Sequence, residues 1–149
     1  MAVLETHIFK AHNNIYIEQP EENYRTREIR TEMVFPDCVN ENTGMLVLIP
    51  GYGGNIDSHV FRKMREVFAE QYNLITVQCD YFGNKFMDVK QPEEMKLIAT
   101  MENIVNAEIY YKVEDFETVE EFNDMGIMQA IDIVSSTICA IYEIIRKGY

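Results

Sequence analysis

The loop Pro50–Asn55 carries the residues of this chain that are best suited to chemistry, and it reads Pro-Gly-Tyr-Gly-Gly-Asn. Three glycines and a proline cannot continue a helix or a strand, so this segment must be a loop. It stands between an apolar run and a helical pattern, where a turn can direct backbone N–H groups at an anion. That geometry would suit a bound phosphate or the oxyanion of a tetrahedral intermediate.

The phosphate interpretation lacks its usual motif. The loop matches neither G-x-x-x-x-G-K-[ST] nor G-x-G-x-x-G, and it contains no lysine. A small α/β domain that binds a phosphate ligand is therefore the weaker alternative. A third interpretation is structural only, because glycine tolerates positive φ and simply permits a tight turn.

The segments around the loop predict an α/β fold. Met45–Ile49 is apolar at every position, which is typical of a strand covered on both faces. After the loop, apolar residues recur at helical spacing between Val60 and Phe68, while charged residues such as Arg65 face away. Leu74–Cys79 then predicts a second buried strand. Together these segments make one βαβ unit with parallel strands and a right-handed crossover.

The first third of the chain predicts antiparallel strands at the edge of the same sheet. The runs Leu4–Phe9, Asn14–Glu18 and Tyr24–Phe35 are of β type. Ala11–Asn13 would be a tight connection between the first two runs, and Pro36 ends the third. Such an antiparallel edge would face solvent on one side.

The last helix is expected over Asn123–Lys147. Its Ile and Val residues are spaced 4, 3, 4, 3 and 4, which predicts one continuous stripe packed in the core. Gly148 would end this helix. The stripe consists of Ile127, Ile131, Val134, Ile138, Ile141 and Ile145.

Composition excludes several classes of function. The chain has 149 residues, 47% of them hydrophobic, and 13 basic against 25 acidic residues give a net charge of −12. Such a field repels nucleic acid and anionic membrane surfaces. The first residues do not read as a signal peptide, the longest unbroken apolar run is far shorter than a membrane span, and the three cysteines do not cluster. We therefore expect a cytoplasmic protein with reduced thiols.

For the other candidate groups we favour structural roles over catalytic or metal-binding ones. His59 follows Asp57 and Ser58 directly, and residues one or two apart on a helix do not face each other, so they do not make a triad. Asp80 is expected to hydrogen-bond within its own turn. The acidic run Glu114–Asp124 could hold a divalent cation, but a solvated connection is far commoner. We therefore expect no metal and no cofactor.

Beyond the loop itself, a resemblance to the α/β-hydrolase superfamily covers nearly the whole chain in order and spacing. Leu48–Gly54 resembles the oxyanion loop after strand 3 of that superfamily, usually His-Gly-x-Gly, with Pro50 where histidine is common. Asp80–Gly83 resembles the Asp-x-x-Gly turn after strand 4, and the last helix corresponds to the one before the nucleophile strand. The loop and Asn123–Ala130 are also similar to a poorly characterised bacterial group of hydrolase-like proteins.

This resemblance implies specific roles for the loop. The backbone N–H of Tyr52 would be an oxyanion-hole donor, and Gly51, Gly53 and Gly54 would shape the loop around it. The second donor in the family follows the nucleophile, yet the sequence contains no G-x-S-x-G motif, and Ser135 and Ser136 lie within the helical pattern. The departure implies that residues 1–149 form a single, incomplete α/β-hydrolase-like domain, inactive alone, from a larger enzyme that hydrolyses an ester, thioester or amide. The alternative is a non-catalytic binding or assembly module on a degenerate scaffold.

The resemblance also implies a strand order of 1, 2, 4, 3, 5, with Met45–Ile49 as strand 3. Without strand 5 this strand would stand at an open edge with unpaired backbone N–H and C=O groups. We therefore expect self-association through the Met45–Ile49 edge, or a complementary partner chain that covers it.

Overall fold

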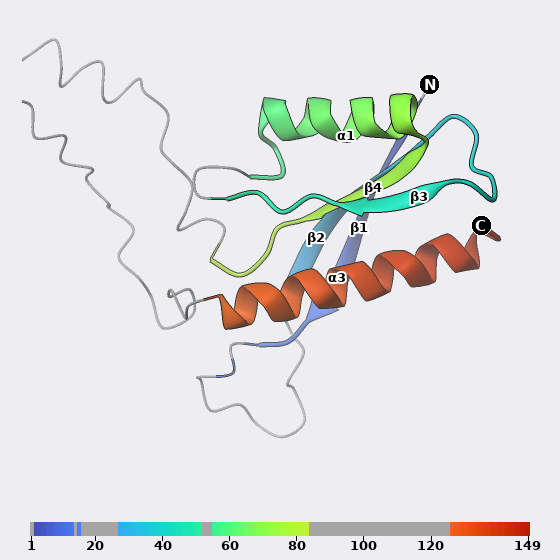
Figure 1. Cartoon of the computed structure of the whole chain (residues 1–149). Coiled ribbons are helices and arrows are strands. Elements are labelled where there is room, and N and C mark those ends of the chain that lie inside the picture. Colours follow the sequence, from blue (N-terminus) through green and yellow to red (C-terminus); the bar gives the residue numbers. More distant parts are fainter. Residues whose placement is uncertain (1, 14, 16–26, 52–54, 84–125) are drawn as a thin grey trace, which may run out of the picture.

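The computed structural model describes residues 2–13, 15, 27–51, 55–83 and 126–149. Within these ranges, four strands form one sheet and a helix lies on each of its faces (Figure 1). The strands are β1 (Val3–Ala11), β2 (Arg27–Phe35), β3 (Gly44–Val47) and β4 (Leu74–Cys79), and the helices are α1 (His59–Tyr72) and α3 (Ile127–Arg146). The predicted α/β class is confirmed.

The sheet is mixed, and its strand order is β1-β2-β4-β3. β1 and β2 pair antiparallel along their whole length, with Val3 opposite Phe35. β2 also pairs antiparallel with β4, whereas β3 and β4 are parallel, with Met45 opposite Ile75. The βαβ unit is therefore present, and the order agrees with the one that the resemblance implied.

Strand boundaries differ modestly from the expectation. The predicted Leu4–Phe9 strand extends to Ala11, which is buried in β1 and is not part of a turn. β3 ends at Val47, although the Leu48 N–H still donates to the Val77 carbonyl at 2.8 Å. In the predicted Asn14–Glu18 strand, only Ile15 is described, and it lies in a turn. The acidic run at 114–124 lies outside the described residues.

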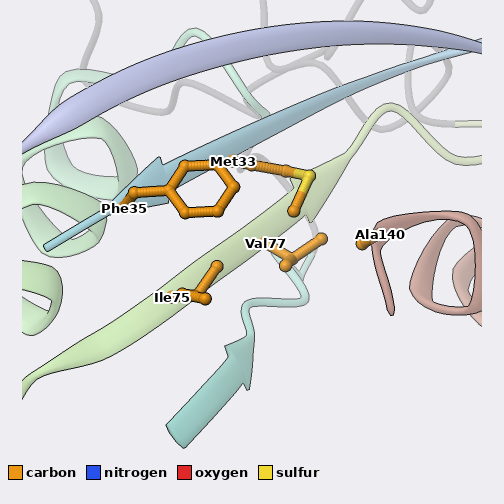
Figure 2. Close-up of a cluster of buried hydrophobic side chains, with 5 residues drawn as sticks. All are labelled: Met33, Phe35, Ile75, Val77 and Ala140. Atoms are coloured by element: carbon orange, nitrogen blue, oxygen red, sulfur yellow. The ribbon is translucent and has the colours of Figure 1, made fainter. Parts of the chain in front are cut away.

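The hydrophobic core lies between the sheet and α3. Figure 2 shows its central cluster, in which side chains from β2 and β4 converge beside Ala140 of α3. Because successive side chains of a strand point to opposite faces, these strand residues all project from the same face. The cluster consists of Met33, Phe35, Ile75, Val77 and Ala140.

The predicted burial of the isoleucine stripe in α3 is wrong. The residues that α3 buries against the sheet are Met128, Asp132, Ser136 and Ala140, one turn apart. The stripe instead lies on the outer face, where all its residues except Ile131 are between 41% and 65% exposed. The reason is that the covered sheet face carries polar groups: the Thr31 and Ser136 hydroxyls lie 2.7 Å apart in a buried hydrogen bond.

The predicted orientation of α1 is also partly wrong. α1 fully buries Arg65 and Ala69, whereas Val60 is 63% exposed. Ser58 occupies the N-cap position without a side-chain hydrogen bond to the helix, and Asn73 ends the helix in the left-handed conformation. The charged Arg65 therefore lies between α1 and the sheet, where an apolar side chain was expected.

α3 is the one helix in the described part of the chain that is long and apolar enough to cross a membrane by length and composition, and 22% of its apolar 18-residue stretch is buried. It begins after Gly126 and is followed by Gly148, both in the left-handed region, so the predicted glycine stop is confirmed. Apart from this apolar helix, the described residues form an α/β fold of the kind typical of soluble proteins.

Candidate functional site

The loop and the turn that the sequence singled out meet at one edge of the sheet. Pro50 follows the carboxyl end of β3, and the Asp80–Gly83 turn follows the carboxyl end of its parallel neighbour β4 (Figure 1). The Tyr81 hydroxyl donates a hydrogen bond to the buried Pro50 carbonyl. In open α/β sheets, ligands bind at this carboxyl edge.

Of the predicted site residues, the structure describes Gly51 alone. Gly51 is exposed, its φ is not in the left-handed region, and a Cβ atom built there would meet nothing within 4 Å. No local constraint therefore requires glycine at this position. Tyr52, Gly53 and Gly54 lie outside the described residues, and the oxyanion role of the Tyr52 N–H stays a prediction.

The far end of the loop is tied to the sheet by arginine. Arg30 of β2 binds both carboxylate oxygens of Asp57, with distances of 3.2 Å and 2.6 Å. The same guanidinium donates from Nε to the Asp80 carboxylate at 2.9 Å. Asp80, which we expected to bond within its own turn, thus joins a bridge between turn and loop. The hydrogen bonds from Arg30 hold the pKa of Asp57 below its usual value.

A buried polar network beneath α1 supports the same loop. Arg65 is 1% exposed, and its Nη1 donates to the Ile56 carbonyl at 3.0 Å and to the Gln78 amide oxygen. Its Nη2 donates to the carboxylate of Glu32 on β2. Burial lowers the pKa of Arg65. Arg65 was predicted to face away from the core, and this is wrong; the polar Thr76 and Gln78 in an otherwise apolar strand were a signal for its buried position.

On the opposite face, α3 holds the turn after β4. Asp132 is completely buried, and its carboxylate accepts a hydrogen bond from the Phe82 N–H at 2.7 Å. Its other oxygen accepts from Arg27 Nη2 at 2.5 Å, and the Arg27 guanidinium lies 5.5 Å from the centroid of the Phe82 ring. These contacts were also missed. Their signal was the spacing of Asp132 and Ser136, one turn apart within an isoleucine-rich helix.

Both helices begin at this edge. α1 starts at His59, just after the loop, and α3 starts at Ile127, where Gln129 lies 3.6 Å from a Cβ built on Gly83. The N-terminus of a helix carries partial positive charge and free backbone N–H groups. The edge is therefore suited to stabilising negative charge.

The serines of the chain do not occupy the position of an α/β-hydrolase nucleophile. All three serines of the chain are described: Ser58 precedes α1, and Ser135 and Ser136 lie within α3. None of them stands at the strand-to-helix turn where an α/β-hydrolase nucleophile is found. Burial raises the pKa of the Cys79 thiol to about 12, so this group stays protonated and unreactive at neutral pH.

A surface depression lies at the other end of the strands from the Pro50–Asn55 loop. A shallow depression of about 460 Å³ lies at the amino edge of β3 and β4, where it is lined by Pro36, Asp37, Cys38, Asn40, Glu70 and Asn73. Within the described ranges, no group of three or more His, Cys, Asp or Glu side chains could hold a metal ion.

The described geometry can therefore do one kind of chemistry at the carboxyl edge. Among the described residues, the starts of two helices lie near the Asp80–Gly83 turn, where backbone N–H groups suit an anion, and Arg30, Arg65 and Asp132 hold the neighbouring segments. Comparisons with protein-family models, with curated proteins and with solved structures found no match to this chain.

Proposed function

We propose that this chain supplies the oxyanion loop of an α/β-hydrolase-like domain and performs no hydrolysis alone. The observation that carries the proposal is the contact between Pro50, at the start of the loop, and Tyr81, in the Asp80–Gly83 turn, at the carboxyl ends of β3 and β4 in a sheet ordered β1-β2-β4-β3. In this proposal the Tyr52 N–H donates to the oxyanion, and Gly51, Gly53 and Gly54 shape the loop. The complete protein hydrolyses an ester, a thioester or an amide, and it works in the cytoplasm.

Anchoring of the described residues on either side of Tyr52–Gly54 supports this role. Donors stabilise a developing oxyanion only when they are already fixed at the moment of reaction. The loop is fixed at its start by the bond from Tyr81 to the Pro50 carbonyl and at its end by the bond from Arg65 to the Ile56 carbonyl. One donor without a hydroxyl nucleophile gives no turnover, so the attacking serine belongs to residues outside this chain.

The first test is reaction with a serine-directed probe. The purified chain should show no hydrolysis of a p-nitrophenyl ester above the buffer rate, and a fluorophosphonate should not label Ser58, Ser135 or Ser136. The reason is that Ser136 is hydrogen-bonded and buried, and the other two serines lack an elbow position. Intact-mass spectrometry measures the labelling, and stoichiometric modification of any serine would contradict the proposal.

Coding DNA downstream of Tyr149 separates this proposal from its alternative. A strand followed by Gly-x-Ser-x-Gly within about fifteen codons would supply the missing nucleophile. A stop codon would favour a non-catalytic binding or assembly module, which needs no triad.

Phosphate binding is the remaining alternative for the same edge, because helix N-termini also bind phosphate. Millimolar inorganic phosphate should leave the melting temperature unchanged if the loop serves an oxyanion. A rise in melting temperature would favour the phosphate-ligand function, since a ligand of the folded state stabilises by mass action.

We also propose that the outer edge of β3 takes up a further strand, from a second copy or from a complementary chain. The Gly44 and Leu48 N–H groups donate toward β4, so those of Met45 and Val47 point to the outer edge. Among the described strands, β3 pairs with β4 alone. An edge of this kind is a template for strand addition.

Amide hydrogen exchange tests the β3 edge. In the associated protein the Met45 and Val47 amides should exchange slowly, at least tenfold slower than in the dissociated chain. Val47→Pro removes one outward donor and should abolish the protection at Met45, while the Leu48 bond to Val77 remains. Fast exchange at Met45 at every protein concentration would show that nothing pairs with this edge.

A further inference from the structure

The outer face of α3 presents an apolar seam with the geometry of a helix–helix interface. We define the seam by its six members, Ile127, Ile131, Val134, Ile138, Ile141 and Ile145. Their spacing of 4, 3, 4, 3 and 4 is the a/d repeat of helices that pack side by side, knobs into holes. The same spacing also suits a helix that packs on a sheet, but the sheet covers the opposite face of α3, so this face is left for a second helix.

The seam cannot turn inward to join the core. The opposite face of α3 is held to the sheet by the buried ion pair between Asp132 and Arg27 and by the hydrogen bond between Ser136 and Thr31. Rotation of α3 about its axis would break this ion pair and this hydrogen bond, and it would offer no new partners to Arg27 and Thr31. Because Val134 is 57% and Ile138 is 61% exposed, the seam lies open in the described fold.

Two identical seams can pack together without repulsion between like charges. The positions that flank the seam carry no charged side chain: they are Met128, Ala130, Ser135, Thr137, Tyr142 and Ile144. Glu143 lies off the seam and is paired with Arg146. The net charge of −12 is therefore not concentrated where a second copy would approach.

The area available is enough for a specific dimer. Complete burial of the exposed side-chain area of the seam and of Tyr142 in two copies would remove on the order of 1,200 Å² from solvent, the lower end of the range for specific interfaces. A bilayer suits this face less well. Helices that lie in a membrane surface carry Lys and Arg on the polar face, whereas the polar face of α3 is Asp132 and Ser136 against the sheet.

We propose that the α3 seam is a dimer interface in which the same face of a second copy packs against it. The inference does not rest on the hydrolase proposal, because neither the loop nor the turn contributes to the seam. Of the residues that flank the seam, Met128 is fully buried and Ile144 packs against the core cluster of its own chain, so the seam and Tyr142 supply the contact.

Matched charge substitutions test the interface. Light scattering at tens of micromolar should give wild-type protein twice the 17.5 kDa mass of the chain. Val134→Glu should weaken dimerisation at least a hundredfold, because it places a carboxylate in the apolar contact of both copies. Val60→Glu is the control, since Val60 on α1 is 63% exposed and lies off the seam, and it should leave the dimer intact. Circular dichroism should show both variants folded.

Several results would overturn the proposal: a monomeric wild-type protein, a dimer that survives Val134→Glu, or equal loss of the dimer in Val60→Glu. Loss of the dimer in Val47→Pro but not in Val134→Glu would assign association to the β3 edge. Cosedimentation of a monomeric wild-type chain with phosphatidylcholine vesicles, abolished by Val134→Glu, would make the bilayer the occupant of the seam and would equally refute a dimer.

Discussion

Replacing Arg65 by methionine should lower the free energy of unfolding by about 3–5 kcal/mol, the usual loss when one partner of a buried ion pair is removed. Arg65 is 1% exposed and bonds Glu32, Gln78 and the Ile56 carbonyl. Methionine fills much of the same space but donates no hydrogen bond. The Glu32 carboxylate would stay beneath α1 without its partner, and the loop would lose the bond that fixes its end.

Urea denaturation followed by circular dichroism measures this loss. The matched control is Arg62→Met, on the same helix one turn away and exposed, which should change the stability by less than about 0.5 kcal/mol. Adding Glu32→Gln to Arg65→Met should recover part of the loss, because a neutral amide costs less to bury than an unpaired carboxylate. If Arg65→Met and Arg62→Met unfold at the same urea concentration, the buried network does not hold α1 to the sheet.

The strands of this fold could be predicted from the sequence because backbone pairing and burial leave a direct pattern there. Leu74–Cys79 and Met45–Ile49 are apolar runs bounded by turn residues, and both form parallel neighbouring strands. The predicted cover on both faces of the second run is wrong, because β3 ends at Val47 and none of its residues is fully buried. The loop between them followed from its glycines. The position of the Asp80–Gly83 turn beside Pro50 then followed from the parallel arrangement of β3 and β4, since both segments leave the same edge.

The buried faces of both helices could not be predicted from hydrophobicity. That reasoning places the most apolar stripe inward, yet α3 turns its isoleucines outward and buries Asp132 and Ser136. The face that a helix buries is decided by hydrogen-bond partners for its polar side chains as well as by burial of its apolar side chains. The partners here are Arg27, Thr31 and the Phe82 N–H, which come from other parts of the chain and are invisible in a helical periodicity.

The location of the candidate site could be predicted from the sequence, but the side chains that hold its loop and turn in place could not. Sequence identified the loop and the turn, but the side chains that hold them were assigned to solvent or to local turns. Arg65 is charged, which predicts exposure on average, and only the polar residues at alternate positions of β4 indicated that a charged partner sits above them. Long-range pairs such as Arg30 with Asp57 depend on the register of β2 against β4, which one sequence does not reveal.

Asp132→Ala should be about as damaging as the loss of Arg65, with a decrease of about 3–5 kcal/mol in the free energy of unfolding. The substitution removes the acceptor of the Phe82 N–H and the anion that pairs with Arg27. The buried N–H would lose its partner, which costs free energy beyond the lost bond itself. Asp132→Asn keeps an oxygen acceptor for that N–H but loses the charge, so a smaller decrease of about 1–3 kcal/mol is expected.

The relative decreases in the free energy of unfolding show whether Asp132 holds the turn after β4 or whether any substitution in α3 is equally destabilising. Glu143→Gln, on the same helix and paired with a surface arginine, should cost less than about 1 kcal/mol. Amide exchange at Phe82 gives a local readout, because Asp132→Ala frees this N–H while Asp132→Asn retains its acceptor. Equal stability of Asp132→Ala and Glu143→Gln would mean that α3 is held by its apolar contacts alone. The outward isoleucines would then lack the polar anchor that fixes their direction, and the seam would lose its structural basis.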